Sequence, residues 1–208
     1  MSGPEVGSAA LREFLLNALK TERGVHLESL LACLGSVGGF SCHMAARAAM
    51  NQGELATEGG LMEVVSADGR TYYFGNAINK LLVESPFSFW NFVRGPADAA
   101  GGQLVDVDEI IDRVARSVGS EAFGLPDLPE QHPIHFPPLE CVKSLWPLVM
   151  GFLAEHCDTP VEHPQLIGMT TQQLIVEGQS AISPAISTKI VMECAVPMSK
   201  VGPTWFTG

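Results

Sequence analysis

Basic side chains are scarce in this sequence, and no two of them are adjacent. The 208 residues include 12 lysines and arginines against 23 aspartates and glutamates, which gives a formal net charge of −11. Proteins that bind nucleic-acid phosphates present a clustered basic surface. The scarcity therefore argues against DNA, RNA and an anionic membrane as the main partner, and the acidic surplus is expected to serve solubility.

Marks of secretion and of a membrane span are also lacking. There is no Asn-x-Ser/Thr sequon, and no basic region followed by an apolar run begins the chain. The longest apolar stretch, residues 27–50, is interrupted by Glu28, His43 and Arg47, so we expect it not to cross a membrane. Five cysteines, an odd number, are typical of buried free thiols in a reducing compartment. We therefore expect a cytoplasmic protein.

Apolar residues are plentiful for a chain of this length. They make up 46% of the sequence while charged residues make up only 17%, and the mean hydropathy is +0.19. A chain this small has a limited interior, so part of the apolar surface is expected to be covered by a partner. The simplest such partner is a second copy, and we predict a homo-oligomer, most simply a twofold dimer.

Helical spacing of apolar residues dominates the sequence and predicts a mainly α fold. The spacing favours a compact multi-helix domain of about eight helices, with a break or kink where glycines cluster at residues 35–39. The predicted helical segments cover residues 9–23, 27–34, 40–51, 76–82, 86–94, 107–118, 139–157, 165–177 and 184–196.

One small β-hairpin is predicted near residues 61–74. Two β-rich runs flank the Asp68-Gly69 pair, which is a strong short-range signal for a hairpin turn. An isolated hairpin is only marginally stable in water, so it needs cover from helices, a third strand or a second copy. The segment Thr204–Phe206 is one candidate for that third strand.

The chain divides into three stretches that are expected to form one structural domain. Residues 1–119 form a helical region with the hairpin, and residues 139–208 form C-terminal helices that pack on it. Between them, residues 120–138 contain five prolines, a composition that predicts an extended connector.

The first candidate site is an anion or thiol site in the glycine-rich segment, at Gly38, Gly39, Ser41, Cys42 and His43. A glycine break that leads into a helix exposes free N–H groups, which bind anions, and a thiol near a helix N-terminus gains reactivity. The alternative, which we favour, is a helix crossing at which glycines permit close contact.

The second candidate is a metal site, because four of the six histidines fall between positions 132 and 163. These are His132, His135, His156 and His163. Zinc or iron accepts such ligands, but the spacing matches no established metal motif. Turn and cap histidines near prolines explain the cluster equally well, so no cofactor is predicted and a divalent metal stays an open alternative.

The third candidate is a ligand pocket around the hairpin and an aromatic-rich helix. Its candidate residues are Tyr72, Tyr73, Asn76, Trp90 and Arg94. An apolar cavity with a few polar groups is the usual small-molecule site, and arginine suits a carboxylate or phosphate. The favoured alternative is a core aromatic cluster with polar edges.

Three functional hypotheses remain open on the sequence alone. The first is a helical binding or scaffold module that acts as a homo-oligomer. The second is a small-molecule-binding protein or enzyme with a pocket near Tyr72, Trp90 and Arg94. The third is a metal- or thiol-dependent enzyme that uses the His132–His163 cluster or Cys42, and no motif specifies a substrate or a reaction.

Overall fold

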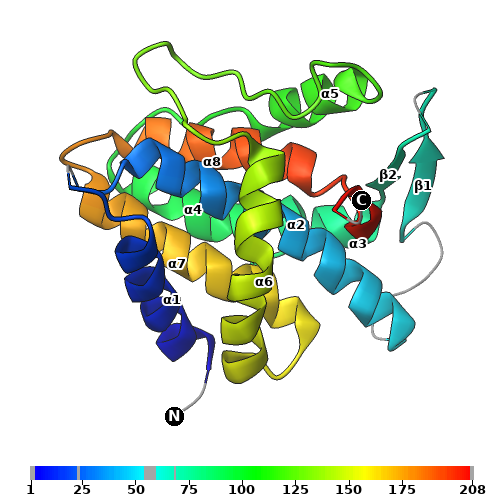
Figure 1. Cartoon of the computed structure of the whole chain (residues 1–208), viewed down its shortest axis with the longest axis horizontal. Helices are drawn as coiled ribbons and strands as arrows, with labels where there is room; N and C mark the ends of the chain where they lie inside the picture. The colour runs from blue at the N-terminus through cyan, green and yellow to red at the C-terminus, as the bar shows by residue number, and fades with distance from the viewer. Residues whose placement is uncertain (1–2, 23, 54–59, 68, 207–208) are drawn as a thin grey trace.

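A computed structural model describes residues 3–22, 24–53, 60–67 and 69–206 (Figure 1). The predicted class is confirmed, because the fold is mainly α with one antiparallel hairpin and about eight helices. The α-helices are α1 (Pro4–Ala18), α2 (Leu27–Asn51), α3 (Asn76–Asn79), α4 (Phe89–Ala99), α5 (Val107–Ser117), α6 (Pro138–His156), α7 (His163–Gly178) and α8 (Pro184–Met198). A π-helical turn (Lys80–Glu84) and two 3₁₀ turns (Pro160–Glu162, Pro203–Trp205) complete the helical elements.

Helix α2 is the central element of the fold. It packs against α6, α7 and α8, and nearly every residue from Ser29 to Ala46 is buried (Figure 1). By length and composition it is apolar enough to cross a membrane, and 94% of its most apolar window is buried inside the protein. The packing of neighbouring helices around it gives this composition a structural explanation as a core helix.

The predicted break at residues 35–39 is wrong, because α2 runs through the glycines without interruption. A Cβ atom at Gly35 or Gly39 would overlap backbone atoms of α8, and one at Gly38 would overlap the Phe89 ring. Glycine in a helix interior costs roughly 0.5–1 kcal/mol relative to alanine. Here the cost is offset by close approach of α2 and α8, so the helix-crossing interpretation holds.

The hairpin pairs β1 (Met62–Val65) with β2 (Thr71–Phe74), within the predicted range. Val201 forms a β-bridge with Tyr72 on the other edge of β2. The predicted third strand at 204–206 is wrong, because this segment lies in or beside a 3₁₀ turn, from which Trp205 Nε1 donates to the Thr71 carbonyl oxygen at 2.8 Å. All of β1 is exposed, the turn residue Asp68 lies outside the described residues, and the expected dimer stays a prediction.

The proline-rich connector crosses α8 and the N-terminal end of α2 in turns and extended backbone (Figure 1). The buried carboxylate of Glu193 holds its first half, since it accepts a hydrogen bond from the Asp127 N–H at 3.0 Å and pairs with Arg113 of α5. Further along, the His135 N–H donates to Ser29 Oγ at 3.0 Å. These contacts place the end of the connector beside the start of α2.

Candidate functional site

Two adjacent cavities lie between the C-terminal end of α1, the first half of α2, the start of α6 and the connector. The thiol cavity has a volume of about 300 Å³ and the histidine cavity about 270 Å³. Leu19 and Phe136 line both cavities and form the wall that they share. The thiol cavity is further lined by Cys33, Cys141, Glu140 and Leu145, and the histidine cavity by Lys20, His26, Ser29 and His135.

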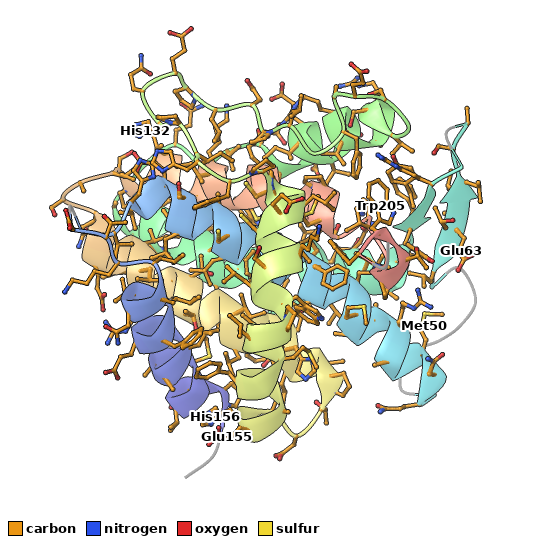
Figure 2. All side chains as sticks on the ribbon, in the orientation of Figure 1. Met50, Glu63, His132, Glu155, His156 and Trp205 are labelled. Atoms are coloured by element: carbon orange, nitrogen blue, oxygen red, sulfur yellow. The ribbon has the colours of Figure 1, made fainter. Side chains whose placement is uncertain are left out.

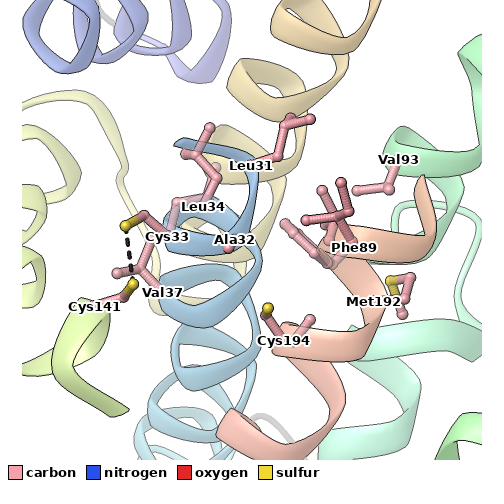
Figure 3. Close-up of a cluster of buried hydrophobic side chains, with 14 of the residues drawn as sticks. Leu31, Ala32, Cys33, Leu34, Val37, Phe89, Val93, Cys141, Met192 and Cys194 are labelled. Atoms are coloured by element: carbon pink, nitrogen blue, oxygen red, sulfur yellow. Dashed lines mark hydrogen bonds between the residues drawn. The ribbon is translucent and has the colours of Figure 1, made fainter. Parts of the chain in front are cut away.

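A pair of thiols from distant parts of the chain defines the thiol cavity (Figure 3). Cys33 lies in the first half of α2 and Cys141 in the first turns of α6, with 2.9 Å between the two Sγ atoms. Both residues are free cysteines, and both are almost fully buried although they line the cavity. Cys141 Sγ also lies 3.8 Å from the Phe136 carbonyl oxygen.

The two thiols are not equivalent. The hydrogen bond from the Cys33 thiol lowers the pKa of Cys141, although burial acts in the opposite direction. The same hydrogen bond, with burial second, raises the pKa of Cys33. The start of a helix adds a positive electrostatic potential, which also favours a thiolate at Cys141. Of the two thiols, Cys141 is therefore the more acidic and Cys33 is the one that keeps its proton more strongly.

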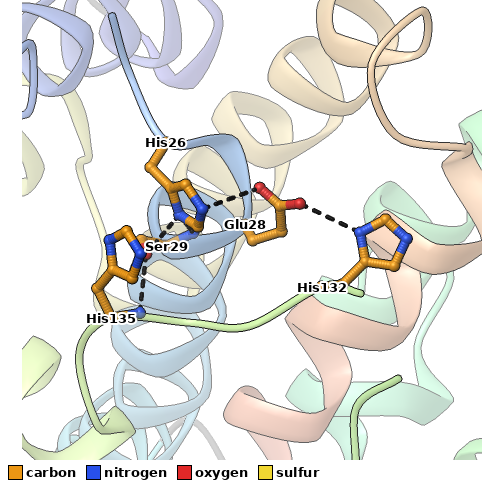
Figure 4. A network of polar contacts seen from close by, with 5 residues as sticks. All are labelled: His26, Glu28, Ser29, His132 and His135. Carbon is orange, nitrogen blue, oxygen red and sulfur yellow. Dashed lines mark hydrogen bonds and ion pairs between the residues drawn. The ribbon is translucent and has the colours of Figure 1, made fainter. Parts of the chain in front are cut away.

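A polar network borders the histidine cavity and ties the connector to α2 (Figure 4). His26 caps α2, because its Nδ1 accepts from the Ser29 N–H at 3.3 Å and lies 2.8 Å from Ser29 Oγ. The His135 ring stacks on His26, with 4.0 Å between ring centroids. Glu28 joins the two sides, with one carboxylate oxygen 3.6 Å from His26 Nε2 and the other 3.1 Å from His132 Nδ1.

The neighbouring imidazole rings lower the pKa of the Glu28 carboxyl group. Partial burial raises the pKa of its carboxyl group, but the hydrogen bond with His132 and the charges of His26 and His132 outweigh it, so the pKa is lowered overall. An ionised Glu28 accepts a hydrogen bond from His132 Nδ1 and lies at ion-pair distance from His26 Nε2. The network therefore holds the histidine side of the cavity in place, and only His26 and His135 of its three rings line the cavity.

The four histidines predicted as a metal cluster separate into two places. His132 and His135 lie in the network at α2, whereas His156 ends α6, far from His132 (Figure 2), and His163 begins α7. His156 packs where a side chain on Gly7 would collide with it. Within the described ranges, no group of three or more His, Cys, Asp or Glu side chains is arranged to hold a metal ion.

The glycine-rich segment lies inside the core. Gly38 and Gly39 contact neighbouring elements, the Ser41 hydroxyl donates to the Gly38 carbonyl at 2.6 Å, and burial raises the pKa of Cys42. His43 Nδ1 lies 2.6 Å from the Val201 carbonyl oxygen, while its Nε2 is buried without a hydrogen-bond partner among the described residues. Because α2 is continuous, this segment offers no free helix N-terminus for an anion.

The residues of the predicted ligand pocket do not gather around one space. Tyr72 packs against Phe123 and Trp205, and its hydroxyl accepts from the Gly119 N–H at 3.2 Å. Tyr73 packs against His43, and Asn76 is exposed. Trp90 is buried in α4, and Arg94 pairs with Asp98 at 2.8 Å. None of the five predicted residues lines the thiol cavity or the histidine cavity.

Apart from His135, which the sequence suggested as a metal ligand, the sequence did not point to the residues that line the cavities, above all Cys33, Cys141 and Leu19. The only local signal is the Pro137-Pro138 start of a helix, which places Cys141 in its first turns. Nothing near Cys33 marks it, because its partner lies 108 residues away in the sequence.

Comparison with protein-family models, with curated proteins and with solved structures finds no match for this chain. The function is therefore argued from the geometry of the two cavities.

Proposed function

We propose that the chain binds a small amphipathic carboxylate in the paired cavities, with its alkyl part in the thiol cavity and its carboxylate in the histidine cavity. The observation that carries the proposal is that the two cavities are adjacent, with Leu19 and Phe136 in both linings, while Lys20, His26 and Ser29 line only the histidine cavity. A ligand that reaches past Leu19 and Phe136 would place its alkyl part against the thiol cavity and its head group beside the Lys20, His26 and Ser29 side chains that line the histidine cavity.

Size and lining support a small ligand. Each cavity lies near the lower end of the roughly 300–1,000 Å³ range of ligand sites, so a short alkyl chain suits them better than a large cofactor. Leu19, Leu145 and Phe136 supply most of the apolar wall of the thiol cavity. Burying an alkyl chain there is favourable by about 0.8 kcal/mol for each CH₂ group removed from water.

Charge sets the orientation of the ligand. Lys20 lines the histidine cavity, whereas Glu140 lines the thiol cavity. A carboxylate is attracted by the ammonium group and repelled by the glutamate, both of which stand at the exposed edges of their cavities. The carboxylate is therefore placed beside Lys20.

Calorimetric titration with octanoate and decanoate, and with octanol and decanol as uncharged counterparts, tests the proposal. Leu19→Trp places a larger side chain in the wall that both cavities share. The indole ring takes up cavity space, so the variant is expected to abolish binding of all four compounds. Leu148→Trp, at an exposed position of α6 outside both cavities, is the matched control and is expected to bind normally. Equal binding by both variants, or no binding of decanoate by the natural chain, contradicts the proposal.

Lys20→Gln separates charge from shape in the same titration. It is expected to weaken decanoate roughly threefold, a loss of about 0.7 kcal/mol, and to leave decanol unchanged. Lys143→Gln is the control, because this exposed lysine of α6 lines neither cavity. An unchanged decanoate affinity in Lys20→Gln would overturn the assigned orientation.

A further inference from the structure

The sulfur atoms of Cys33 and Cys141 are close enough to bond after a small movement. They lie 2.9 Å apart, and a disulfide has a sulfur–sulfur length of about 2.05 Å, so an approach of less than about one ångström suffices. The two residues come from different helices, and both remain free thiols.

Access to the pair is restricted to small molecules. Both side chains are almost fully buried, at 3% and 2% exposure, so a protein disulfide cannot reach them. The cavity that they line gives small molecules a route to the sulfur atoms, and its other walls are largely apolar. A small oxidant with an apolar substituent fits such a space better than a large or strongly hydrated one.

We propose that Cys33 and Cys141 form a redox dithiol that reduces small organic hydroperoxides. The Cys141 thiolate attacks the terminal oxygen of the hydroperoxide, the O–O bond breaks, and the alkoxide leaves with the proton that Cys141 had lost. Cys141 is then a sulfenic acid. The Cys33 thiol attacks its sulfur, a disulfide forms, and water leaves. Two thiols and one hydroperoxide thus give one disulfide, one alcohol and one water.

The assignment of roles follows from the positions of the two residues. Cys141 stands in the first turns of α6 and accepts the hydrogen bond from Cys33, so it is the attacking sulfur. Cys33 lies within reach of the sulfenic acid and keeps its proton until the second step. A small external dithiol such as dithiothreitol returns the disulfide to two thiols and completes the cycle.

Oxidation of the reduced full-length chain by cumene hydroperoxide tests the proposal. The expected product has lost two hydrogens by intact mass, and peptide mapping under non-reducing conditions links Cys33 to Cys141. Cys157→Ser is the control, because Cys157 is only half-buried and belongs to neither cavity, and it should form the same disulfide. Oxidation of Cys157 while the pair stays reduced would overturn the proposal.

Two further variants separate the roles of the sulfurs. Cys33→Ser is expected to stop at a sulfenic acid on Cys141, which dimedone traps, and Cys141→Ser is expected to give neither sulfenic acid nor disulfide. Trapping on Cys33 in place of Cys141 contradicts the assignment. If a variant fails to fold, the intact mass and the mapped linkage of the natural chain still decide whether the disulfide forms.

The shape of the cavity gives the last arm of the experiment. Leu19→Trp narrows it and is expected to slow oxidation by cumene hydroperoxide roughly tenfold, equivalent to about 1.4 kcal/mol of activation free energy, with a smaller effect on hydrogen peroxide. Equal slowing of both oxidants would show that the apolar walls do not select an apolar hydroperoxide. The disulfide is measured without any carboxylate, so failure of the proposed ligand binding and failure of the redox proposal are distinguishable.

Discussion

Cys33 and Cys42 lie on the same helix, yet their surroundings have little in common. At the level of Cys33, α2 faces a second thiol, the start of α6 and a cavity. At the level of Cys42, the helix is enclosed by the end of α8 and by β2, and burial alone raises the pKa of the thiol despite the nearby charge of Lys200. Reactivity therefore depends on what stands across from a cysteine and whether small molecules reach it.

The local sequence points to the wrong cysteine of the two. Cys42 follows a glycine-rich run and precedes a histidine, features that resemble an activated thiol. In the structure the glycines permit contact with α8, and His43 bonds to the Val201 carbonyl. Cys33 lies in an apolar segment with no local motif, and its thiol pairs with Cys141 of α6, 108 residues away in the sequence.

The largest expected effect is a loss of stability when a side chain is introduced at the α2–α8 crossing near Cys42. Gly39→Ala places a methyl group against the Ala195 carbonyl oxygen, and the α2–α8 crossing must separate to admit it. We expect the free energy of unfolding to fall by more than about 3 kcal/mol, measured by urea denaturation.

Gly151→Ala is the matched control for that substitution. Gly151 also lies inside a helix, but nothing surrounds the position of its missing Cβ. Alanine there should stabilise the chain by roughly 0.5–1 kcal/mol, because it favours the helix without a clash. A similar loss of stability in both variants would show that the close crossing is not the cause.

The next effect concerns the buried ammonium group beside Cys42. Lys200 is 2% exposed, and its Nζ lies 5.3 Å from the centre of the Phe74 ring. Burial lowers the pKa of Lys200 from 10.5 to about 8. Since the folded state disfavours the charged form, Lys200→Met should raise the unfolding free energy at neutral pH by about 3 kcal/mol.

The pH dependence of that gain checks its cause. Between about pH 8 and pH 10.5 the folded chain releases the proton of Lys200 before the unfolded chain does, so the natural chain gains stability as pH rises. The advantage of Lys200→Met, followed by chemical denaturation, should therefore shrink across this window. A constant advantage would assign it to packing, and Lys143→Met should change stability by less than about 0.5 kcal/mol.

The smallest of these effects appears on the acid side. Burial lowers the pKa of His43 from 6.5 to about 4. Below about pH 6.5 the imidazole is protonated in the unfolded chain but stays neutral in the folded chain. The free energy of unfolding therefore decreases as the pH is lowered, until the pKa of the folded state is reached. From pH 6.5 to about pH 5 the loss should reach about 2 kcal/mol in the natural chain and be absent in His43→Gln. Parallel losses in both chains would contradict the assignment.

The fold was predictable from the sequence where a signal is local. The apolar spacing of residues 107–118 predicted α5, which Asp106 caps, and the two β-rich runs on either side of Asp68-Gly69 predicted the hairpin. The continuity of α2 was not predictable from the sequence, because only the contact with α8 explains why glycines lie inside a helix. The candidate site was less accessible still, since Leu19, Cys33 and Cys141 meet only after three helices have packed.

The large sequence separation of Cys33 and Cys141 has a thermodynamic consequence for an oxidised chain. A cross-link between them would close a loop of 108 residues, and the chain-entropy model assigns about 4.7 kcal/mol of stabilisation to a loop of roughly 100 residues. Oxidation would tether the first and second halves of the chain, even in the unfolded ensemble. An oxidised chain would then differ from a reduced one in its free energy of unfolding as well as in its number of free thiols.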